Sequence, residues 1–263
     1  MRKKMSLLCL LVILSCQTNP KQEDAQVEEK SNTTLEEPTV PEATEVYEPV
    51  PPKITLGENG IPSDAIVLFD GNDFGEWVST KDSTQVPWHL NGDGSMTVKD
   101  KTGDIQTKRN FGSVQLHIEW QSPAQVERDG QNRGNSGIFL QNRYEVQVLD
   151  NNDNPTYVNG QVGSIYKQSV PLAMASHPSG EWNVYDIIYH APVFDGNGEK
   201  VESGTITVLH NGILIQDHFK IQGTTEYIGW PKNDAHGPAP IKLQDHGDNS
   251  RVSYRNIWVR PLD

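Results

Sequence analysis

The feature that most constrains the fold is a succession of short runs rich in Val, Ile, Tyr, Phe and Trp, extending from Ile61 to Asp263. Clusters of Gly, Asn, Asp and Pro separate these runs, as is typical of turns between strands. Asp195–Gly198 and Asn211-Gly212 contain residues that tolerate the positive φ of tight hairpin turns. No long stretch of residues 61–263 keeps the period of an amphipathic helix. The pattern predicts an all-β domain, folded as a two-sheet antiparallel sandwich or jelly roll.

Alternation of apolar and polar residues predicts where the individual strands lie, because successive side chains of a strand point to opposite faces. We expect strands at Ile66–Phe69, Ser95–Val98, Asp104–Gln106, Val114–Trp120, Ser136–Leu140, Tyr144–Leu149, Gly163–Tyr166, Trp182–Ala191, Thr205–Leu209, Ile213–His218, Ile241–Asp245 and Val252–Arg260.

Some of these strands carry a polar face that could line a cleft. Glu145 and Gln147 share one face of their strand, while the apolar side chains of that strand point the other way. If one sheet face gathered Glu119, Glu145, Gln147, Gln244 and His246, it would form a polar trough. The alternative is a set of separate, solvated strand faces, because a two-residue period does not show which strands are neighbours.

The start of the chain has the layout of a signal peptide. Basic residues at positions 2–4 precede an apolar run from Leu7 to Leu14, which is too short to span a bilayer. Ile13–Cys16 resembles a bacterial lipobox, in which the cysteine becomes lipidated, so we expect residues 1–16 to be a lipoprotein signal peptide. We therefore predict that the protein is a membrane-anchored lipoprotein, located in the periplasm or on the cell surface. An ordinary cleaved secretory signal is the alternative.

Residues 17–60 differ in composition from the rest of the chain. Acidic residues and prolines recur there and large apolar residues are sparse, so the segment cannot bury enough surface to offset its ordering entropy. We expect a disordered tether between the signal peptide and a single domain at residues 61–263. The net charge of −13 and the lack of a basic stripe argue against a nucleic-acid partner.

A set of short motifs, taken in order, resembles one known family. The motifs are Leu68–Gly71 with Trp77, Asn135–Ile138, Tyr144–Asp150, Gly163–Tyr166, Gly180–Asn183, Leu243–Gly247 and Tyr254–Leu262. Their order resembles the 3-keto-disaccharide hydrolase family, formerly a domain of unknown function. The resemblance implies a concanavalin A-like lectin/glucanase fold, whose concave sheet holds sugars. It also implies cleavage of glycosides whose C3 hydroxyl has been oxidised to a ketone.

A more distant similarity concerns the strand that contains Glu145. Glu145–Asp150 is similar to the Glu-x-Asp-x-x-Glu strand of retaining glucanases with the same fold, but Gln147 replaces the middle acid and Asp150 the last. Direct double displacement needs two carboxylates that flank the scissile bond. These two replacements therefore favour a different reaction at the corresponding site.

A 3-keto-glycoside can be cleaved without a glycosyl-enzyme. The ketone acidifies the hydrogen at C2, so a base can remove it and the C1 substituent can leave by elimination, with water adding later. This route needs a base, an acid and a group that stabilises the enolate oxygen. We expect Glu145 and His246 to do the acid/base work, since the pKa of histidine lies near neutral pH. Arg133, Arg143, Lys167 or a metal could stabilise the enolate.

Substrate contacts and a metal ion are further expectations. The residues expected to bind the sugar are Glu119, Arg133, Asn135, Gln147, Asp150, Tyr166, Lys167, Gln244 and Asp245. The oxygen-rich run Asp150–Asn154 could bind calcium, although it lacks the Gly and Glu of an EF-hand loop and a solvated turn is the alternative. Glu145, Asp150 and His246 could instead form a divalent-metal set.

Two other functions stay open from sequence alone. The chain could be a non-catalytic carbohydrate-binding lipoprotein, or a conventional glycoside hydrolase of the same fold. The fold does not separate these classes, because function depends on the chemistry of the site. The oligomeric state is not predicted.

Overall fold

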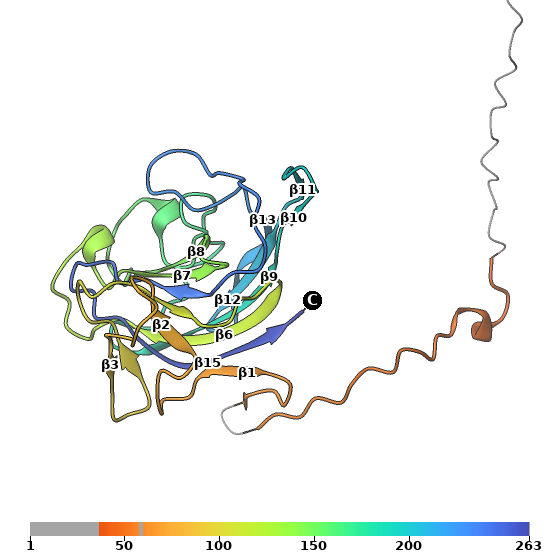
Figure 1. Ribbon diagram of the computed structural model, residues 1–263, viewed down its shortest axis with the longest axis horizontal. Coiled ribbons are helices and arrows are strands. Elements are labelled where there is room, and N and C mark those ends of the chain that lie inside the picture. The colour runs from red at the N-terminus through yellow and green to blue at the C-terminus, as the bar shows by residue number, and fades with distance from the viewer. Residues whose placement is uncertain (1–36, 58–59, 263) are drawn as a thin grey trace, which may run out of the picture. The chain divides into compact units, whose positions relative to one another are not determined.

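The computed structural model describes residues 37–57 and 60–262. The predicted signal peptide, including Cys16, lies outside the described residues. The chain divides into two units, Met1–Pro52 and Lys53–Asp263. Residues 37–52 of the first unit are exposed throughout and contain a single 3-10 turn, η1 (Pro41–Thr44) (Figure 1). None of the helices among the described residues is long and apolar enough to cross a membrane.

The second unit holds all the strands found in the described part of the chain, and its backbone contacts begin before Ile61. Thr55 and Ser63 pair through their backbones, with 2.8 Å between Ser63 N and Thr55 O, and Leu56 pairs with Pro62. Among the described residues the strands form an 8-stranded, a 5-stranded and a 2-stranded sheet. Every strand pairing is antiparallel.

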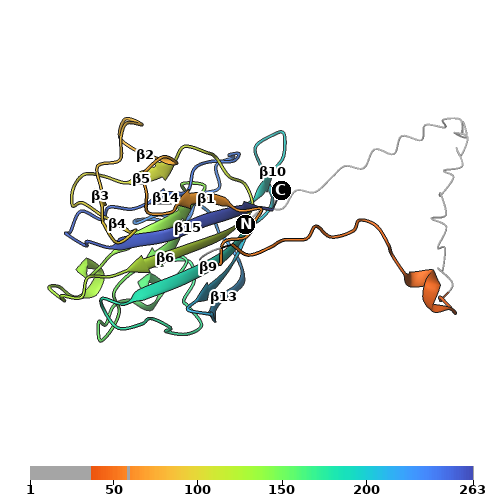
Figure 2. The same cartoon turned by 90° about the horizontal axis from the view of Figure 1, so that it is seen from below.

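The larger sheet has the strand order β13-β12-β9-β6-β15-β4-β3, and β1 pairs with β15. Its strands are β1 (Ile66–Phe69), β3 (His89–Leu90), β4 (Met96–Thr97), β6 (Val114–Gln121), β9 (Trp182–His190), β12 (Thr205–His210), β13 (Ile213–Lys220) and β15 (Ser253–Pro261). Figure 2 shows β15, β6 and β9 side by side. Along β6 every second residue is buried, from Val114 to Trp120, so one face of this sheet covers the core.

The 5-stranded sheet lies across the core and has the order β2-β5-β14-β7-β8. Its strands are β2 (Trp77–Ser79), β5 (Ile105–Thr107), β14 (Lys242–Leu243), β7 (Ser136–Leu140) and β8 (Tyr144–Val148). Gln141 and Asn142, both at positive φ, form the tight turn between β7 and β8, and Arg143 N donates to Leu140 O at 3.0 Å. The register of this hairpin is thereby set, with Phe139 opposite Glu145.

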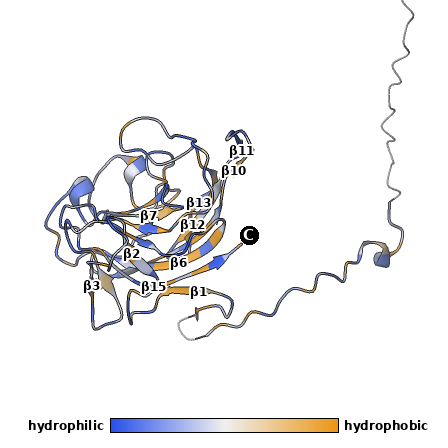
Figure 3. Ribbon diagram, in the orientation of Figure 1, coloured by the Kyte–Doolittle hydropathy of each residue, from blue (hydrophilic) through white to orange (hydrophobic). Residues whose placement is uncertain are grey.

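The core fills the space between these two sheets. Leu116 and Ile187 from the larger sheet and Val146 and Leu243 from the smaller one are fully buried. Figure 3 shows the matching hydrophobic segments, in orange, on strands such as β1 and β6. Short elements outside the two sheets are the hairpin β10 (Val193–Phe194) with β11 (Lys200–Glu202) and the 3-10 turns η3 (Gly130–Asn132) and η4 (Val158–Gly160).

The all-β, two-sheet jelly roll is confirmed, with local differences from the predicted strands. Gly163–Tyr166 is a turn with single bridges from Ile165 to Val146 and Ser169, because Gly163 has a φ of 78° that ends regular pairing. The strand predicted at Ile241–Asp245 is reduced to β14. The short strands β2, β3, β10 and β11 were not predicted.

Candidate active site

A pocket of 310 Å³ lies on the face of the 5-stranded sheet that points away from the core. Strand β8 supplies its polar floor, because Val146 and Val148 point into the core and Glu145 and Gln147 point the opposite way. The complete lining is Asn135, Phe139, Glu145, Gln147, Tyr166, Thr225, Tyr227, Gln244 and His246. The pocket therefore gathers Glu145, Gln147, Gln244 and His246 of the predicted trough.

The neighbouring strand β7 leaves room for the Glu145 side chain. Gly137 lies next to Phe139 on the same face, opposite Gln147. A Cβ atom at position 137 would overlap Oε1 of Glu145 and the ring of Phe139. Glycine is needed here for close packing, because the carboxyl group lies directly over this backbone.

Glu145 is buried without a partner for its charge. It is 5% exposed, and none of the hydrogen bonds or ion pairs found among the described residues involves its carboxyl group. Burial raises the pKa of Glu145 to about 8, with the Lys242 ammonium lowering it and the Asp104 carboxylate raising it. A carboxyl group of this kind is protonated at neutral pH and can act as a general acid.

His246 follows β14 in a loop and has a carboxylate behind it. Its Nδ1 atom lies 2.9 Å from Oδ2 of Asp248, whose side chain is 8% exposed. The two groups are within ion-pair distance, although neither oxygen of Asp248 accepts a hydrogen bond among the described residues. Gly247, with a φ of 75°, turns the chain so that the two side chains meet. Sequence reasoning missed Asp248, although the His-Gly-Asp spacing could have pointed to it.

Amide side chains form the other polar wall of the pocket. Nε2 of Gln147 donates to Oδ1 of Asn135 at 3.2 Å, and Nδ2 of Asn135 donates to the Gln131 carbonyl at 2.7 Å. Oε1 of Gln147 is buried and has no hydrogen-bond partner. Buried acceptors are rarely left unpaired, so this oxygen suits a hydroxyl group brought in by a ligand. The Gln244 side chain also lines the pocket and makes no hydrogen bond among the described residues.

Comparison with known proteins identifies the family. Residues 64–260 match the family described as the 3-keto-alpha-glucoside-1,2-lyase-like domain. The chain belongs to this family. The resemblance to the 3-keto-disaccharide hydrolases is thereby confirmed.

Two crystal structures from Parabacteroides distasonis ATCC 8503, both of proteins provisionally named glycosyl hydrolases, resemble this family member. One is 55% identical over 85% of this chain and 97% of that chain, with a TM-score of 0.82. The other is 22% identical over 76% of this chain and 94% of that chain, with a TM-score of 0.56, and shows the shared fold alone. No curated protein matches. Family and neighbours support a carbohydrate-acting, glycosyl-hydrolase-like enzyme.

Glu119 lies apart from the pocket of this lyase-like domain. It belongs to β6 of the larger sheet and points away from the core, where its carboxylate binds Nε of Arg255 at 2.6 Å and Nδ2 of Asn256 at 2.8 Å. The trough suggested from sequence therefore does not include it. The reason is topological: β6 and β8 belong to opposite sheets, whose outer faces point in opposite directions.

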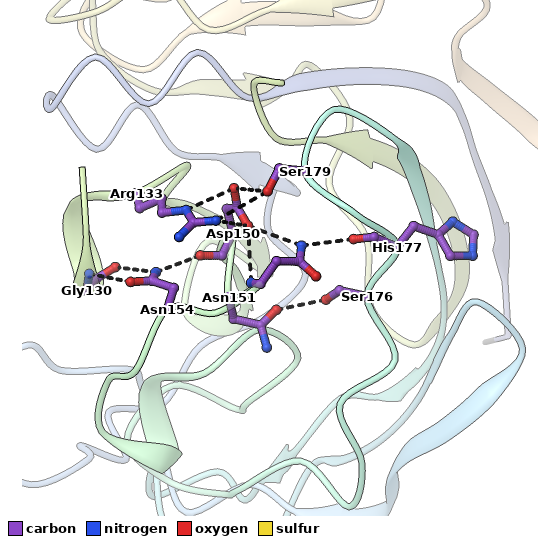
Figure 4. A network of polar contacts seen from close by, with 9 residues as sticks. Gly130, Arg133, Asp150, Asn151, Asn154, Ser176, His177 and Ser179 are labelled. Carbon is purple, nitrogen blue, oxygen red and sulfur yellow. Dashed lines mark hydrogen bonds and ion pairs between the residues drawn. The ribbon is translucent and has the colours of Figure 1, made fainter. Parts of the chain in front are cut away.

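Arg133 and Asp150 form a separate buried ion pair. Nε of Arg133 lies 3.1 Å from Oδ2 of Asp150, which is 2% exposed and also accepts a hydrogen bond from Ser179 at 2.6 Å (Figure 4). Asp245, next to the pocket residue Gln244, accepts hydrogen bonds from the backbone of Gly103 and Gly247. These carboxylates hold loops together and do not line the pocket.

The oxygen-rich run Asp150–Asn154 is used within the protein. Asn154 bonds both backbone groups of Gly130 (Figure 4). Asn152 donates to the His177 carbonyl at 2.9 Å. The set Glu145, Asp150 and His246 is not assembled, because Asp150 is paired with Arg133. Among residues 37–57 and 60–262, no group of three or more His, Cys, Asp or Glu side chains is arranged to hold a metal ion.

The remaining residues expected at the site lie around Tyr166. Tyr166 lines the pocket and its hydroxyl group lies 2.6 Å from that of Tyr157. Nζ of Lys167 lies 4.5 Å from the centre of the Tyr227 ring, at the edge of the pocket. Arg143 instead bonds the Gln141 carbonyl, at 3.2 Å, in the β7–β8 turn.

Proposed function

We propose that this domain cleaves 3-keto-glycosides by removing the C2 proton and eliminating the C1 substituent. The observation that carries the proposal is one pocket lined by two groups of different acid–base character. Glu145 is a buried carboxyl group with a pKa of about 8, and His246 is a histidine backed by the Asp248 carboxylate. Paired groups in contrasting environments are typical of acid–base catalysis.

The reaction balances with these two groups alone. His246 takes the proton from C2 through Nε2, and the electron pair of the C2–H bond moves toward the C3 ketone. The C1–C2 double bond then forms as the C1–O bond breaks, and the departing oxygen takes the proton of Glu145. Positioned proton transfer of this kind contributes roughly 10²–10⁴-fold to a rate. Addition of water to the new double bond would give net hydrolysis.

The amide wall supplies the binding contacts in this scheme. Gln244 has a free amide that can donate to the ketone oxygen, where negative charge develops as C2 loses its proton. The unpaired Oε1 of Gln147 can accept a sugar hydroxyl. Glu145 is the sole carboxylate among the described residues that line the pocket. This favours elimination over conventional hydrolysis, which needs a pair of carboxylates.

Incubation of the purified domain with a glucoside and with its 3-keto form tests the proposal. Cleavage of the oxidised sugar alone is expected. Cleavage of both would instead show a conventional glycoside hydrolase, and binding without cleavage a carbohydrate-binding protein. Deuterium at C2 provides a second readout, because proton abstraction must lose or exchange that label whereas displacement at C1 retains it.

A further inference from the structure

A second cavity, of 390 Å³, adjoins the first. Tyr166 lines both cavities, and the lining of the second also includes Tyr157, Trp230 and Lys167. The two spaces therefore meet at one tyrosine side chain.

One loop borders the two cavities and is attached to the strand that carries Glu145. The loop closes where Thr224 N donates to Lys232 O at 2.8 Å. Thr225 N donates to Arg143 O at 2.9 Å, and Glu145 N donates to Oγ1 of Thr225 at 3.1 Å. From this base the loop places Tyr227 in the first cavity and Trp230 in the second.

The aromatic side chain of Trp230 stands open at the rim of the second cavity. It is 88% exposed, which leaves nearly all of its apolar surface in water. Tyr227, on the same loop, is also largely exposed. Neighbouring exposed aromatic groups beside a cavity are typical of binding sites, and an indole ring stacks well on flat apolar surfaces.

The charged groups of the second cavity are already paired. Oε1 of Glu226 lies 3.0 Å from Nζ of Lys232, and Lys167 donates to the Tyr227 carbonyl. The second cavity thus offers surface for binding but no free acid or base. Glu145 and His246 lie in the first cavity, so the oxidised ring whose C2 proton is removed belongs there.

Resting on the function proposed above, we propose that the second cavity binds the leaving group of the 3-keto-glycoside and selects aglycones with a flat apolar face. An aryl ring and a second sugar ring both present such a face. The C1–O bond that breaks then crosses from one cavity to the other beside Tyr166.

Steady-state kinetics with 3-keto-glucosides that carry methyl, phenyl or glucosyl leaving groups test this inference. Trp230→Ala should raise KM for the phenyl or glucosyl substrate by about tenfold relative to the methyl substrate, because stacking is lost. The kcat should hold, since this contact is equal in ground and transition states. Comparison of the phenyl and glucosyl substrates shows which aglycone is preferred.

Ile228→Ala is the matched control, since Ile228 is 82% exposed on the same loop and lines neither cavity. It should leave the ratio of the KM values unchanged. An unchanged ratio in Trp230→Ala, or an equal change for the methyl substrate, overturns the inference while leaving the proposed function standing. Failure of the parent domain to cleave any of the three substrates overturns the proposed function and this inference with it.

Discussion

Asp248 lies behind His246, with 2.9 Å between its Oδ2 atom and the Nδ1 atom of the imidazole. The carboxylate is almost completely enclosed, and neither of its oxygens has a hydrogen-bond partner among the described residues, so its contact with His246 is an ion-pair approach. The carboxylate thus lies beside Nδ1, and we infer that Nε2 is the nitrogen that would take a proton from the substrate. We propose that Asp248 acts through this histidine, as a positioning residue.

Replacement of Asp248 tests that role. Asp248→Asn keeps the shape of the side chain but can donate to Nδ1, which favours the tautomer with its proton on Nε2. We expect kcat for a 3-keto-glucoside to fall by about 10²-fold or more with KM little changed. Asp248→Glu, which restores a carboxylate, should recover part of kcat. Equal losses in both variants would show that Asp248 only supports the loop.

Replacing either Glu145 or His246 should slow turnover to a similar extent. Glu145→Gln and His246→Ala should each fold, keep most affinity for the oxidised sugar and lose roughly 10²–10⁴-fold in kcat. The parent rate should fall as the pH rises above about 8, because Glu145 then loses the proton that it gives to the leaving group. A variant that turns over at near the parent rate would assign that residue a structural role.

Glu145 also makes the stability of the protein depend on pH. Its pKa rises from an ordinary value of 4.5 to about 8 on folding, so the folded state binds the proton more tightly than the unfolded state does. The free energy of unfolding should therefore fall as the pH rises from about 4.5 to about 8. Glu145→Gln should remove this fall, which chemical denaturation at several pH values would measure. If the free energy of unfolding depended on pH in the same way in the parent and the variant, this assignment to Glu145 would be wrong.

A different pH dependence is expected from His117 and Glu119 on the outer face of the larger sheet. Burial lowers the pKa of His117, but the hydrogen bond to Asp186 and the nearby Glu119 carboxylate, 3.8 Å away, outweigh this and raise it to about 9. The stabilisation from the charged histidine is complete below its unfolded pKa of about 6.5 and is lost as the pH rises through about 9. His117→Gln should abolish this alkaline loss, whereas substitution of the exposed His190 should not.

Glu119 should matter at acid pH instead. Burial raises its pKa, but the nearby His117 imidazole and hydrogen bonds from Asn256 and Arg255 lower it to about 2. Its stabilisation is present above the unfolded value of about 4.5 and is lost as the pH falls toward about 2. Glu119→Gln should flatten the acid side of the curve of unfolding free energy against pH. If this variant still lost the same free energy of unfolding at acid pH, the loss would have to come from other carboxylates.

The location of the protein is also a proposal that an experiment can decide. Cys16 follows a basic and then apolar segment, so we propose that it carries the lipid that anchors the chain to a membrane. Cys16→Ser should move the protein from the membrane fraction to the soluble fraction. Retention of the substituted protein with membranes would show that another feature holds it there.

The residue pattern by itself determined the fold class and much of the pocket. Alternation along β6 and β9 indicated half-buried strands, since burial of one sheet face imposes a two-residue period. The same period placed Glu145 and Gln147 on one face, and the motif order identified the family. These conclusions rest on local rules that hold wherever a strand lies in the fold.

Only the tertiary structure decided which of the polar residues meet. Glu119 alternates as regularly as Glu145, but its strand belongs to the opposite sheet. Asp150 is close to Glu145 in sequence, yet it is paired with Arg133 on another loop. Asp248 and Trp230 reach the site from loops, whose paths depend on long-range hydrogen bonds rather than on a repeating pattern. Periodicity sets the face of a strand, but strand order and loop closure set its neighbours.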